Sequence, residues 1–393
     1  MPSATIVGLQ WGDEGKGKIL DVLASNADLV ARFQGGGNAG HTVVAGGTKY
    51  VFHLIPTGIL HPDVTCVIGN GAVIDVVALQ QEIQGLEELN VSLRGLKVAS
   101  RAHVVFPYHK ALDEAREIAR TGADKIGTTK RGIGPCYADK ASRTGIRIAD
   151  LFDPKRFGER LRRALDEKNA VLTQLFRRAP LEFEPILRES LAAAAVLRPF
   201  VTSSNTWAAG VSAGAGVPPK AVGRVLGITK AYTTRVGAGP FPTELSGEPG
   251  DRLREKGHEF GATTGRPRRC GWLDLPQLRY AVRLCGVDGI VLTKLDTLSG
   301  YGPLQVCVGY ELAGEPIRTP PADADDWGSL RCSYEELTGI PADVDWSSIR
   351  SYDAFPAEAK AYVSYIEERL GVPVSMISIG PEREAIVQRE DIF

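Results

Sequence analysis

The sequence lacks the cysteine patterns that are typical of zinc-binding and disulfide-stabilised proteins. Its six cysteines are scattered along the chain, without a Cys-x-x-Cys pair and without a cluster of histidines beside them. Structural zinc is therefore not expected, and buried free thiols in a reducing compartment are the simplest interpretation.

Long apolar runs and an excess of charge of one sign are missing as well. No run approaches the roughly 18 apolar residues that a membrane-spanning helix requires, and the first residues, MPSATIVGLQW, lack the basic region of a signal peptide. The formal net charge is −1, which gives no indication of a surface for nucleic acid or anionic membranes. We expect a cytoplasmic protein with neither kind of partner.

Glycine is what the sequence has in excess, with 44 residues beside an ordinary apolar content of 43%. This combination indicates tight turns and close backbone approaches rather than disorder. A chain of 393 residues can form one large domain or two smaller ones. Because no internal repeat, low-complexity tract or linker interrupts it, we predict a single domain over residues 1–393.

Short apolar segments alternate with helical patterns along the chain. Strands are expected at residues 4–9, 29–33, 64–68 and 289–293, and helices at 16–24, 73–89, 110–120, 155–175 and 356–370. This alternation predicts an α/β fold with a large, mainly parallel β-sheet flanked by helices, like that of P-loop NTPases, with smaller helical and loop subdomains. Ligands of such folds bind at the carboxyl ends of the strands.

The segment GDEGKGKI, from Gly12 to Ile19, begins like a phosphate-binding loop but departs from the pattern. A Ser or Thr hydroxyl, which would hold Mg²⁺, should follow Lys18, and Ile19 cannot replace it. Backbone N–H groups in a glycine-rich turn before a helix still form an anion site. Asp13 would repel phosphates unless it holds a metal ion or acts as a base, so it can serve as the metal ligand instead. A glycine-rich turn that binds nothing is the alternative.

Polar residues also follow the next expected strand, in the segment FQGGGNAGHT from Phe33 to Thr42. Asn38 could contact a polar ligand, the carbonyl of Gly40 is open to a cation, and His41 could donate or share a proton. A single histidine is more often structural than catalytic. Two glycine-rich loops at the ends of successive strands favour a functional interpretation, because α/β sites assemble there.

The segment GIVLTKLD, Gly289 to Asp296, ends an apolar strand with a lysine and a carboxylate. Guanine-specific proteins place a lysine stem along the purine face and a carboxylate at its edge. Asp296 could accept from both N1–H and the exocyclic amine of guanine, which adenine cannot match. The four residues Thr-Lys-Leu-Asp are weak evidence alone, but together with a phosphate loop they favour GTP over ATP.

Two basic, glycine-rich loops could bind further anions. IGTTKRGIGP, residues 126–135, offers hydroxyl and guanidinium groups for a second phosphate, and FGATTGRPRR, residues 260–269, offers arginine forks that suit a dicarboxylate. The alternative for each is a solvated basic loop.

The chain resembles the adenylosuccinate synthetase family along nearly its whole length. The matching stretches, in order, are QWGDEGKGK, GGGNAGHT, HLIPTGIL, IGNGAVID, IGTTKRGIGP, VTSSNT, KAYTTRVGAGPFPTEL, EFGATTGR, GWLDL, LTKLD and SIGPER. The resemblance implies GTP-dependent ligation of IMP and L-aspartate to adenylosuccinate through 6-phosphoryl-IMP, in the AMP branch of purine biosynthesis. It also implies one Mg²⁺ per site and a homodimer with shared active sites.

The resemblance assigns the catalytic roles to three residues. Asp13 would remove the N1 proton of IMP and ligate Mg²⁺, together with the carbonyl of Gly40. His41 would contact the transferred phosphoryl group, and Lys16 would neutralise phosphate charge.

The resemblance also assigns binding residues for each substrate. The GTP set is Gly12, Glu14, Gly15, Lys16, Gly17, Lys18, Gly40, Thr42, Arg268, Lys294, Asp296, Ser378 and Gly380. The IMP set is Asn38, Thr129, Arg143, Thr202 and Arg266, with Arg143 reaching the site of the partner subunit. The aspartate set is Thr263, Thr264, Arg266 and Arg268.

The sequence departs from the family at two places. Pro267 replaces an arginine of the aspartate loop, a mild change if the outer arginines bind. Before VTSSNT the family has a strand ending in Glu-Gly-Ala-Gln-Gly, with a glutamine that contacts IMP, whereas here Phe200 runs directly into Val201. Either the numbering passes over a segment that is not shown or the chain lacks it. A lost strand would expose unpaired backbone and impair activity.

Two alternatives to an active ligase therefore stay open. One is a catalytically impaired or dead paralogue, which the missing segment suggests. The other is a GTP-binding regulatory protein, which would need neither a second phosphate site nor an arginine loop for aspartate.

Overall fold

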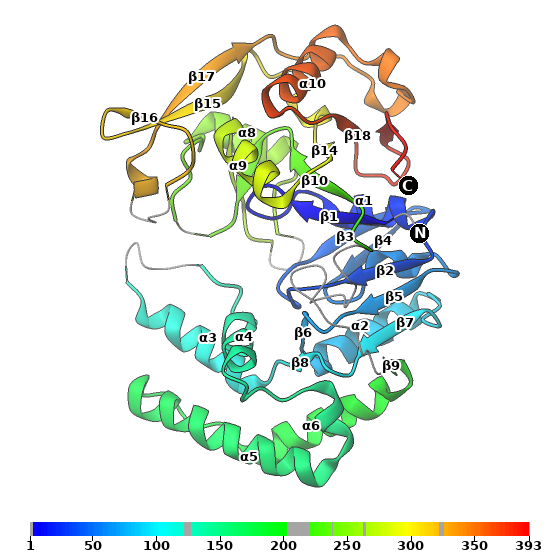
Figure 1. The fold of residues 1–393 in the computed structure, drawn as a ribbon, viewed down its shortest axis with the longest axis vertical. Helices are drawn as coiled ribbons and strands as arrows, with labels where there is room; N and C mark the ends of the chain where they lie inside the picture. The colour runs from blue at the N-terminus through cyan, green and yellow to red at the C-terminus, as the bar shows by residue number, and fades with distance from the viewer. Residues whose placement is uncertain are drawn as a thin grey trace. The chain divides into compact units, whose positions relative to one another are not determined.

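The computed structural model describes residues 3–121, 127–202, 221–237, 239–261, 265–321 and 326–392 (Figure 1). The chain divides into two compact units. Unit 1 comprises Met1–Ile19, Val43–Tyr50 and Val222–Phe393, and unit 2 comprises Leu20–Thr42 and Val51–Ala221. This division does not test the single domain expected from the sequence, which stays a prediction.

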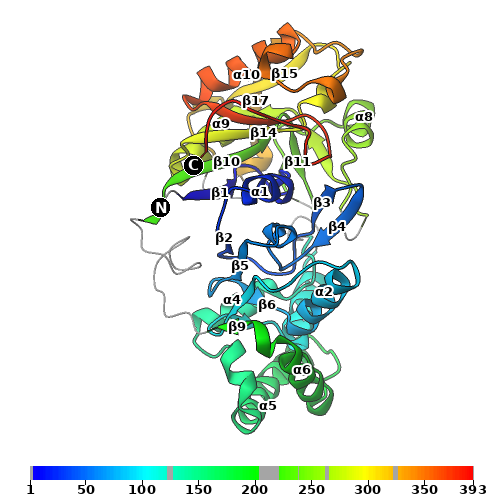
Figure 2. The same ribbon diagram turned by 90° about the vertical axis from the view of Figure 1, so that its right-hand side faces the viewer.

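Unit 1 is built on a mainly parallel sheet of strands from both ends of the chain. Its order is β1 (Ala4–Gly8), β10 (Arg224–Lys230), β14 (Gly289–Thr293), β18 (Val374–Ser378) and β19 (Ile386–Gln388). The first four strands are mutually parallel and β19 is antiparallel to β18. Figure 2 shows β1, β10 and β14 side by side. The carboxyl ends of these strands therefore meet at one edge of the sheet.

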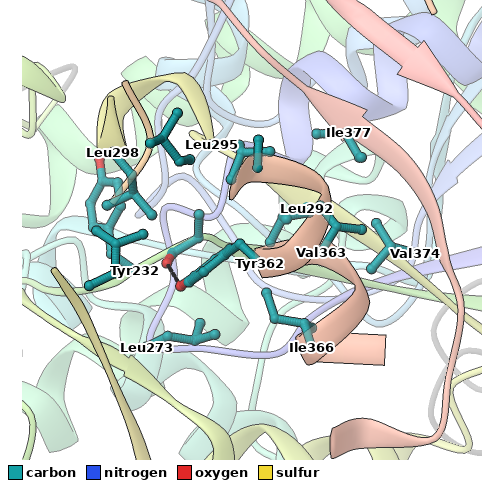
Figure 3. Close-up of a cluster of buried hydrophobic side chains, with 14 of the residues drawn as sticks. Tyr232, Leu273, Leu292, Leu295, Leu298, Tyr362, Val363, Ile366, Val374 and Ile377 are labelled. Carbon is teal, nitrogen blue, oxygen red and sulfur yellow. Dashed lines mark hydrogen bonds between the residues drawn. The ribbon is translucent and has the colours of Figure 1, made fainter. Parts of the chain in front are cut away.

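The central strands of this sheet are covered on both faces. Every residue of β14 and β18 is buried, as expected for parallel strands with helices packed against them. Side chains of α9 (Leu275–Cys285) and α10 (Ala357–Leu370) join the strands in one apolar cluster (Figure 3). Tyr362 belongs to this cluster, and its hydroxyl donates to the Ala231 carbonyl at 2.6 Å.

Unit 1 carries smaller elements beside this sheet. A second sheet contains β13 (Leu273–Asp274), β15 (Leu304–Leu312), β16 (Glu315–Ile317) and β17 (Arg331–Leu337). The antiparallel pair of β11 (Thr233–Arg235) and β12 (Arg269–Gly271) and the helix α8 (Glu248–Lys256) flank the arginine loop. Helix α1 (Lys16–Ala24) follows β1, and β3 (His41–Ala45) pairs with β4 (Thr48–Phe52).

Unit 2 contains an all-parallel sheet and a group of helices. The strand order is β2 (Leu29–Arg32), β5 (Thr65–Ile68), β7 (Leu96–Ala99) and β9 (Val201–Thr202). The short strands β6 (Val73–Ile74) and β8 (His103–Val104) pair separately. The helices are α2 (Val76–Glu88), α3 (Pro107–Ala119), α4 (Ile133–Ala141), α5 (Pro154–Ala170) and α6 (Phe183–Leu197).

The fold class expected from the sequence is confirmed, with an α/β architecture and mainly parallel strands flanked by helices. The helix expected at residues 73–89 is partly wrong, because its first two residues form β6. Asp75 accepts a hydrogen bond from the N–H of Ala78 and thereby fixes the helix start after itself. Among the described helices, none is both long and apolar enough to cross a membrane.

The chain is continuous at the junction where the family segment was expected. Helix α6 passes through a 3₁₀ turn, Arg198–Phe200, into β9, and the N–H of Val201 donates to the Arg198 carbonyl. Within the described residues, strand β9 comprises Val201 and Thr202 and pairs with β7.

Candidate functional site

The predicted phosphate loop connects β1 to α1 in unit 1. Three of its residues have positive φ angles, with values of 100° at Gly12, 60° at Asp13 and 89° at Gly15. Aspartate tolerates this left-handed conformation better than most side chains do. Helix α1 begins at Lys16, so the loop leads into a helix N-terminus, the arrangement that favours anions.

Glu14 lies inside this loop and holds it together. Its side chain is 1% exposed, and its Oε1 accepts hydrogen bonds from the backbone N–H groups of Gln10 at 3.2 Å and Gly12 at 3.0 Å. Lys16 donates to the other carboxylate oxygen. Burial alone would raise the pKa of Glu14, but Lys16 and the backbone donors hold it below the usual range. A β-carbon on Gly8 would lie 2.7 Å from the carboxylate, so the side chain of Glu14 would have to shift if any other residue stood there.

The predicted guanine pocket lies at the carboxyl ends of β14 and β18. Lys294 follows β14 with a φ of 64°, and its Nζ donates to the Gly257 carbonyl at 2.8 Å. Oδ1 of Asp296 is buried without a hydrogen-bond partner among the described residues. Burial raises the pKa of Asp296, while Lys294 and Lys18 act in the opposite direction. A buried acceptor without a partner is costly, and a ligand with N–H donors would satisfy it.

Lys18 connects the phosphate loop to the segment that follows β18. Its Nζ donates to Ser378 Oγ at 2.9 Å and to the carbonyls of Gly380 at 2.7 Å and Ala385 at 3.0 Å. These three bonds use all the donors of the ammonium group. Burial lowers the pKa of Lys18 to about 8, although Asp296 acts in the opposite direction. Lys18 therefore positions the loop of Ser378 and Gly380 in this structure.

Arg268 brings the arginine loop to the phosphate loop. Its Nε donates to Asp13 Oδ2 at 3.0 Å, and its Nη1 donates to Glu259 Oε2 at 2.7 Å. Arg266 is exposed, and Pro267 forms a backbone bridge with Phe260. The predicted aspartate ligands Thr263 and Thr264 lie outside the described residues.

The predicted residues after β2 belong to unit 2 and β3. Asn38 is exposed, whereas Gly40, His41 and Thr42 are partly exposed. His53, in the HLIPTGIL stretch, holds this loop, with its Nδ1 3.1 Å from the Ala39 carbonyl.

The backbone at the start of the HLIPTGIL stretch is held by the carboxylate of Glu82. Glu82 accepts from the N–H groups of His53, Leu54 and Ile55 at 2.9, 2.9 and 3.0 Å. Burial raises the pKa of Glu82, and these three donors counteract the shift. No role was predicted for His53 from the sequence. Its position in the HLIPTGIL stretch, which resembles the family, could have indicated one.

The other predicted IMP residues of unit 2 are exposed. Thr129 precedes α4, and Thr202 ends β9. Arg143 follows α4 with a φ of 65° and is exposed.

The structure also reveals a buried pair that sequence reasoning missed. Lys230 ends β10, and its Nζ donates to Glu259 at 2.8 Å, with side chains that are 2% and 0% exposed. A lysine at the end of a largely apolar strand, RVLGITK, could have indicated this pair. Such a lysine is expected to be buried, and a buried charge requires a partner of opposite charge.

The predicted site residues of unit 1 offer groups that a nucleotide could use. The phosphate loop leads into the N-terminus of α1, Asp296 after β14 offers a buried acceptor, and Asp13 offers an exposed carboxylate held by Arg268. The described residues contain no cluster of three His, Cys, Asp or Glu side chains that could hold a metal ion. A cation would therefore depend on a single carboxylate, carbonyl groups and the phosphates of a ligand.

Comparisons with known proteins agree with this interpretation. The family model described as adenylosuccinate synthetase matches residues 5–199 and 197–387. The adenylosuccinate synthetase of Oleidesulfovibrio alaskensis is 45% identical over 429 residues, covering 99% of this chain and all of that protein. That of Desulfatibacillum aliphaticivorans is 46% identical over 432 residues, covering all of both chains.

Solved structures give the same result. The fully ligated adenylosuccinate synthetase of Plasmodium falciparum superposes with a TM-score of 0.90 at 36% identity, covering 99% of this chain and 100% of that one. A cyanophage S-2L succinoaminodeoxyadenylate synthetase, with a TM-score of 0.58 at 20% identity, shares the fold.

The alignments also locate the missing family segment. The alignment with the Desulfatibacillum protein spans 432 positions and covers all of this chain, so it exceeds the 393 residues by 39. The family model matches in two pieces that meet at residues 197–199, next to the junction of Phe200 and Val201. The relatives therefore have residues here that this chain does not.

Proposed function

This chain belongs to the adenylosuccinate synthetase family, and we propose that the residues described above ligate IMP and L-aspartate to adenylosuccinate at the expense of GTP. The full-length identity to relatives with this activity supports the reaction, and nothing in the comparisons supports a dead paralogue or a regulatory protein. The observation that supports the nucleotide assignment best is the buried Oδ1 of Asp296. It is an acceptor placed where a guanine edge would supply donors.

GTP is proposed to bind across the carboxyl edge of the unit 1 sheet. Asp296 accepts from the base, Lys294 lies along it, and Ser378 and Gly380 close the pocket from β18. The backbone of the phosphate loop receives the phosphates, and Lys16 neutralises part of their charge. This arrangement selects guanine, because adenine would leave the buried carboxylate unpaired.

Asp13 is proposed to act as the base for the first step. It removes the N1 proton of IMP while the γ-phosphoryl group of GTP moves to the 6-oxygen, which gives 6-phosphoryl-IMP and GDP. The amine of aspartate then attacks C6 and displaces phosphate. Phosphorylation is necessary because the 6-oxygen is otherwise a poor leaving group, and catalysis of the transfer consists mostly of positioning and charge neutralisation.

Mg²⁺ fits the oxygen donors that the chain offers. Asp13 is exposed and the Gly40 carbonyl is partly exposed, and Mg²⁺ typically takes one or two carboxylates together with phosphate oxygens and water. Asp13 and Gly40 would hold the ion, which would neutralise charge on the phosphates when bound. His41 is proposed to hydrogen-bond the transferred phosphoryl group.

The remaining substrate and subunit contacts are proposals of the same kind. Asn38, Thr129, Thr202 and Arg266 would contact IMP, and Arg266 with Arg268, Thr263 and Thr264 would bind aspartate. The exposed guanidinium of Arg143 would reach the IMP of a second copy, which requires a homodimer. A cytoplasmic location would supply all three substrates.

The decisive experiment supplies GTP, IMP and aspartate together and follows adenylosuccinate. Product should form only when all three are present, whereas GTP hydrolysis that is indifferent to IMP would contradict the proposal. Asp13→Ala should lower kcat by about 10²-fold or more, the usual contribution of a general base. The control is Asp343→Ala, which removes another exposed carboxylate of unit 1 and should leave the rate unchanged.

A further inference from the structure

The carboxylate of Asp296 depends on its backbone for its position. Asp296 begins a short 3₁₀ turn, Asp296–Leu298, which follows β14. The hydrogen bonds of such turns have poorer geometry than those of an α-helix. Among the described residues none donates to Oδ1 of Asp296, so the place of this oxygen is set by whatever holds the backbone of the turn.

The carboxyl-terminal half of α8 holds the backbone after this turn. Lys256, the last residue of α8, donates through Nζ to the carbonyl of Ser299. Arg252 lies four positions earlier and therefore on the same face of the helix, and its Nη2 donates to the carbonyl of Gly300 at 2.8 Å. The guanidinium of Arg252 also lies over the ring of Tyr301, 4.6 Å from the ring centroid. Three successive residues after the turn are thus in contact with one helix face.

The same end of α8 holds the backbone before the turn. The Nζ of Lys294 donates at 2.8 Å to the carbonyl of Gly257, the residue directly after α8. Asp296 therefore lies between two attachments to one helix end, Lys294 on one side and Ser299 with Gly300 on the other.

Ser299 connects the attachment of Lys256 directly to Asp296. The N–H of Ser299 donates to the Asp296 carbonyl at 3.2 Å, and its hydroxyl accepts from Trp346 Nε1 at 2.7 Å. Ser299 is itself buried. A displacement of Ser299 would therefore move the backbone of Asp296 with it.

We propose that Lys256 and Arg252 are positioning residues for the selection of guanine, which attach the turn of Asp296 to α8 and so place its carboxylate to accept from both donors of a guanine edge. A site that recognises a base by paired hydrogen bonds needs its acceptor held in place by supporting residues. A small displacement lengthens or bends one of the two bonds and weakens it steeply. The proposal rests on the GTP binding proposed above, and neither Lys256 nor Arg252 contacts the nucleotide in it.

Calorimetric binding of GTP and ITP, without IMP or aspartate, tests this role. The two nucleotides carry the same ribose and phosphates and differ only in the exocyclic amine, so the ratio of their dissociation constants reports on the base edge. In Lys256→Met the preference for GTP over ITP should fall by about five- to tenfold, because one of the two hydrogen bonds to Asp296 is weakened. Arg252→Met should shift the ratio in the same direction, and Lys256→Arg, which keeps a charged donor, should restore it.

Lys360→Met is the matched control. The Nζ of Lys360 donates to the Asp353 carbonyl at 2.7 Å, so this variant removes the same kind of bond from α10. It should leave the preference for GTP over ITP and the melting temperature unchanged. A merely structural role of Lys256 would instead lower the melting temperature and weaken both nucleotides alike.

Equal losses of GTP and ITP affinity in Lys256→Met would overturn the proposal, and so would a wild type that binds the two nucleotides equally well. If the wild type prefers GTP but forms no adenylosuccinate from GTP, IMP and aspartate, the proposed ligase activity fails. The binding ratios then still decide the role of Lys256.

Discussion

Asp296→Asn tests the guanine pocket by replacing a buried acceptor with an amide of the same size. In the structure Oδ1 of Asp296 is buried and has no partner among the described residues, so a ligand with N–H donors could satisfy it. A guanine edge would donate two hydrogen bonds to the carboxylate, each worth about 1.5–3 kcal/mol to a charged acceptor. Asparagine keeps one acceptor and presents an N–H₂ group to the second donor.

The expected cost is about 3 kcal/mol of binding free energy, or roughly a 100- to 200-fold higher KM for GTP. The KM for IMP should stay within about threefold, because IMP does not contact this residue. ITP, which lacks the exocyclic amine, should lose less than GTP on the same substitution. Initial rates with GTP, ITP and ATP measure these ratios, with the exposed Asp345→Asn as the matched control.

The same substitution should stabilise the protein without ligand. Burial raises the pKa of Asp296, because the ionised carboxylate is less favourable in the folded state than in water. The protonated carboxyl group therefore contributes stability at low pH. This contribution is lost as the pH rises through the folded pKa. An asparagine avoids this cost, and we expect the free energy of unfolding at pH 7 to rise by about 1 kcal/mol. Equal losses for GTP and IMP, or lower stability together with unchanged GTP binding, would refute the reasoning.

Two further predictions concern the phosphate loop and acid stability. Gly8→Ala should weaken GTP binding, because its β-carbon would lie 2.7 Å from Glu14 Oε1 and would displace the side chain that holds the loop; calorimetry measures this, and Gly85→Ala, with open space around it, should bind normally. The pKa of Glu259 is lowered to about 2 because Lys230 and its hydrogen bonds outweigh burial. Its contribution to stability is therefore present above the unfolded pKa and lost as the pH falls toward 2, a loss on the order of 3 kcal/mol. Urea unfolding between pH 6 and 2 should show this slope in the wild type, and an equal slope in Lys230→Met/Glu259→Gln would contradict it.

Local patterns were sufficient for the elements that carry the site. Strand β14 and helix α1 lie where the sequence predicts them, because a short apolar run and a glycine-punctuated helix start are properties of neighbouring residues. The start of α2 was wrong because it depends on the cap at Asp75 and on the pairing of β6 with β8. Pairing between distant strands leaves no signal in a short window of sequence.

The sequence was sufficient to propose the residue types of the candidate site but not the contacts between them. Lys18 was expected to face phosphates, yet its partner Ser378 is 360 positions away in the sequence. The partner of Lys230 is 29 positions away, directly before a basic loop whose charge pattern indicated an anion site rather than a buried carboxylate. A motif specifies which groups are present, and the fold decides which of them remain available to a ligand.

The phosphate loop shows why a missing hydroxyl is compatible with nucleotide chemistry. Ile19, which stands where a Ser or Thr is usual, is fully buried and can only pack. The loop carries two carboxylates, and their surroundings differ. Glu14 is turned inward onto backbone N–H groups and Lys16, so it stabilises the loop without facing a phosphate. Asp13 is turned outward on a positive φ angle and held by Arg268. The loop therefore exposes one carboxylate whose charge an arginine offsets, an arrangement that the proposed role of Asp13 as a base beside phosphates would require.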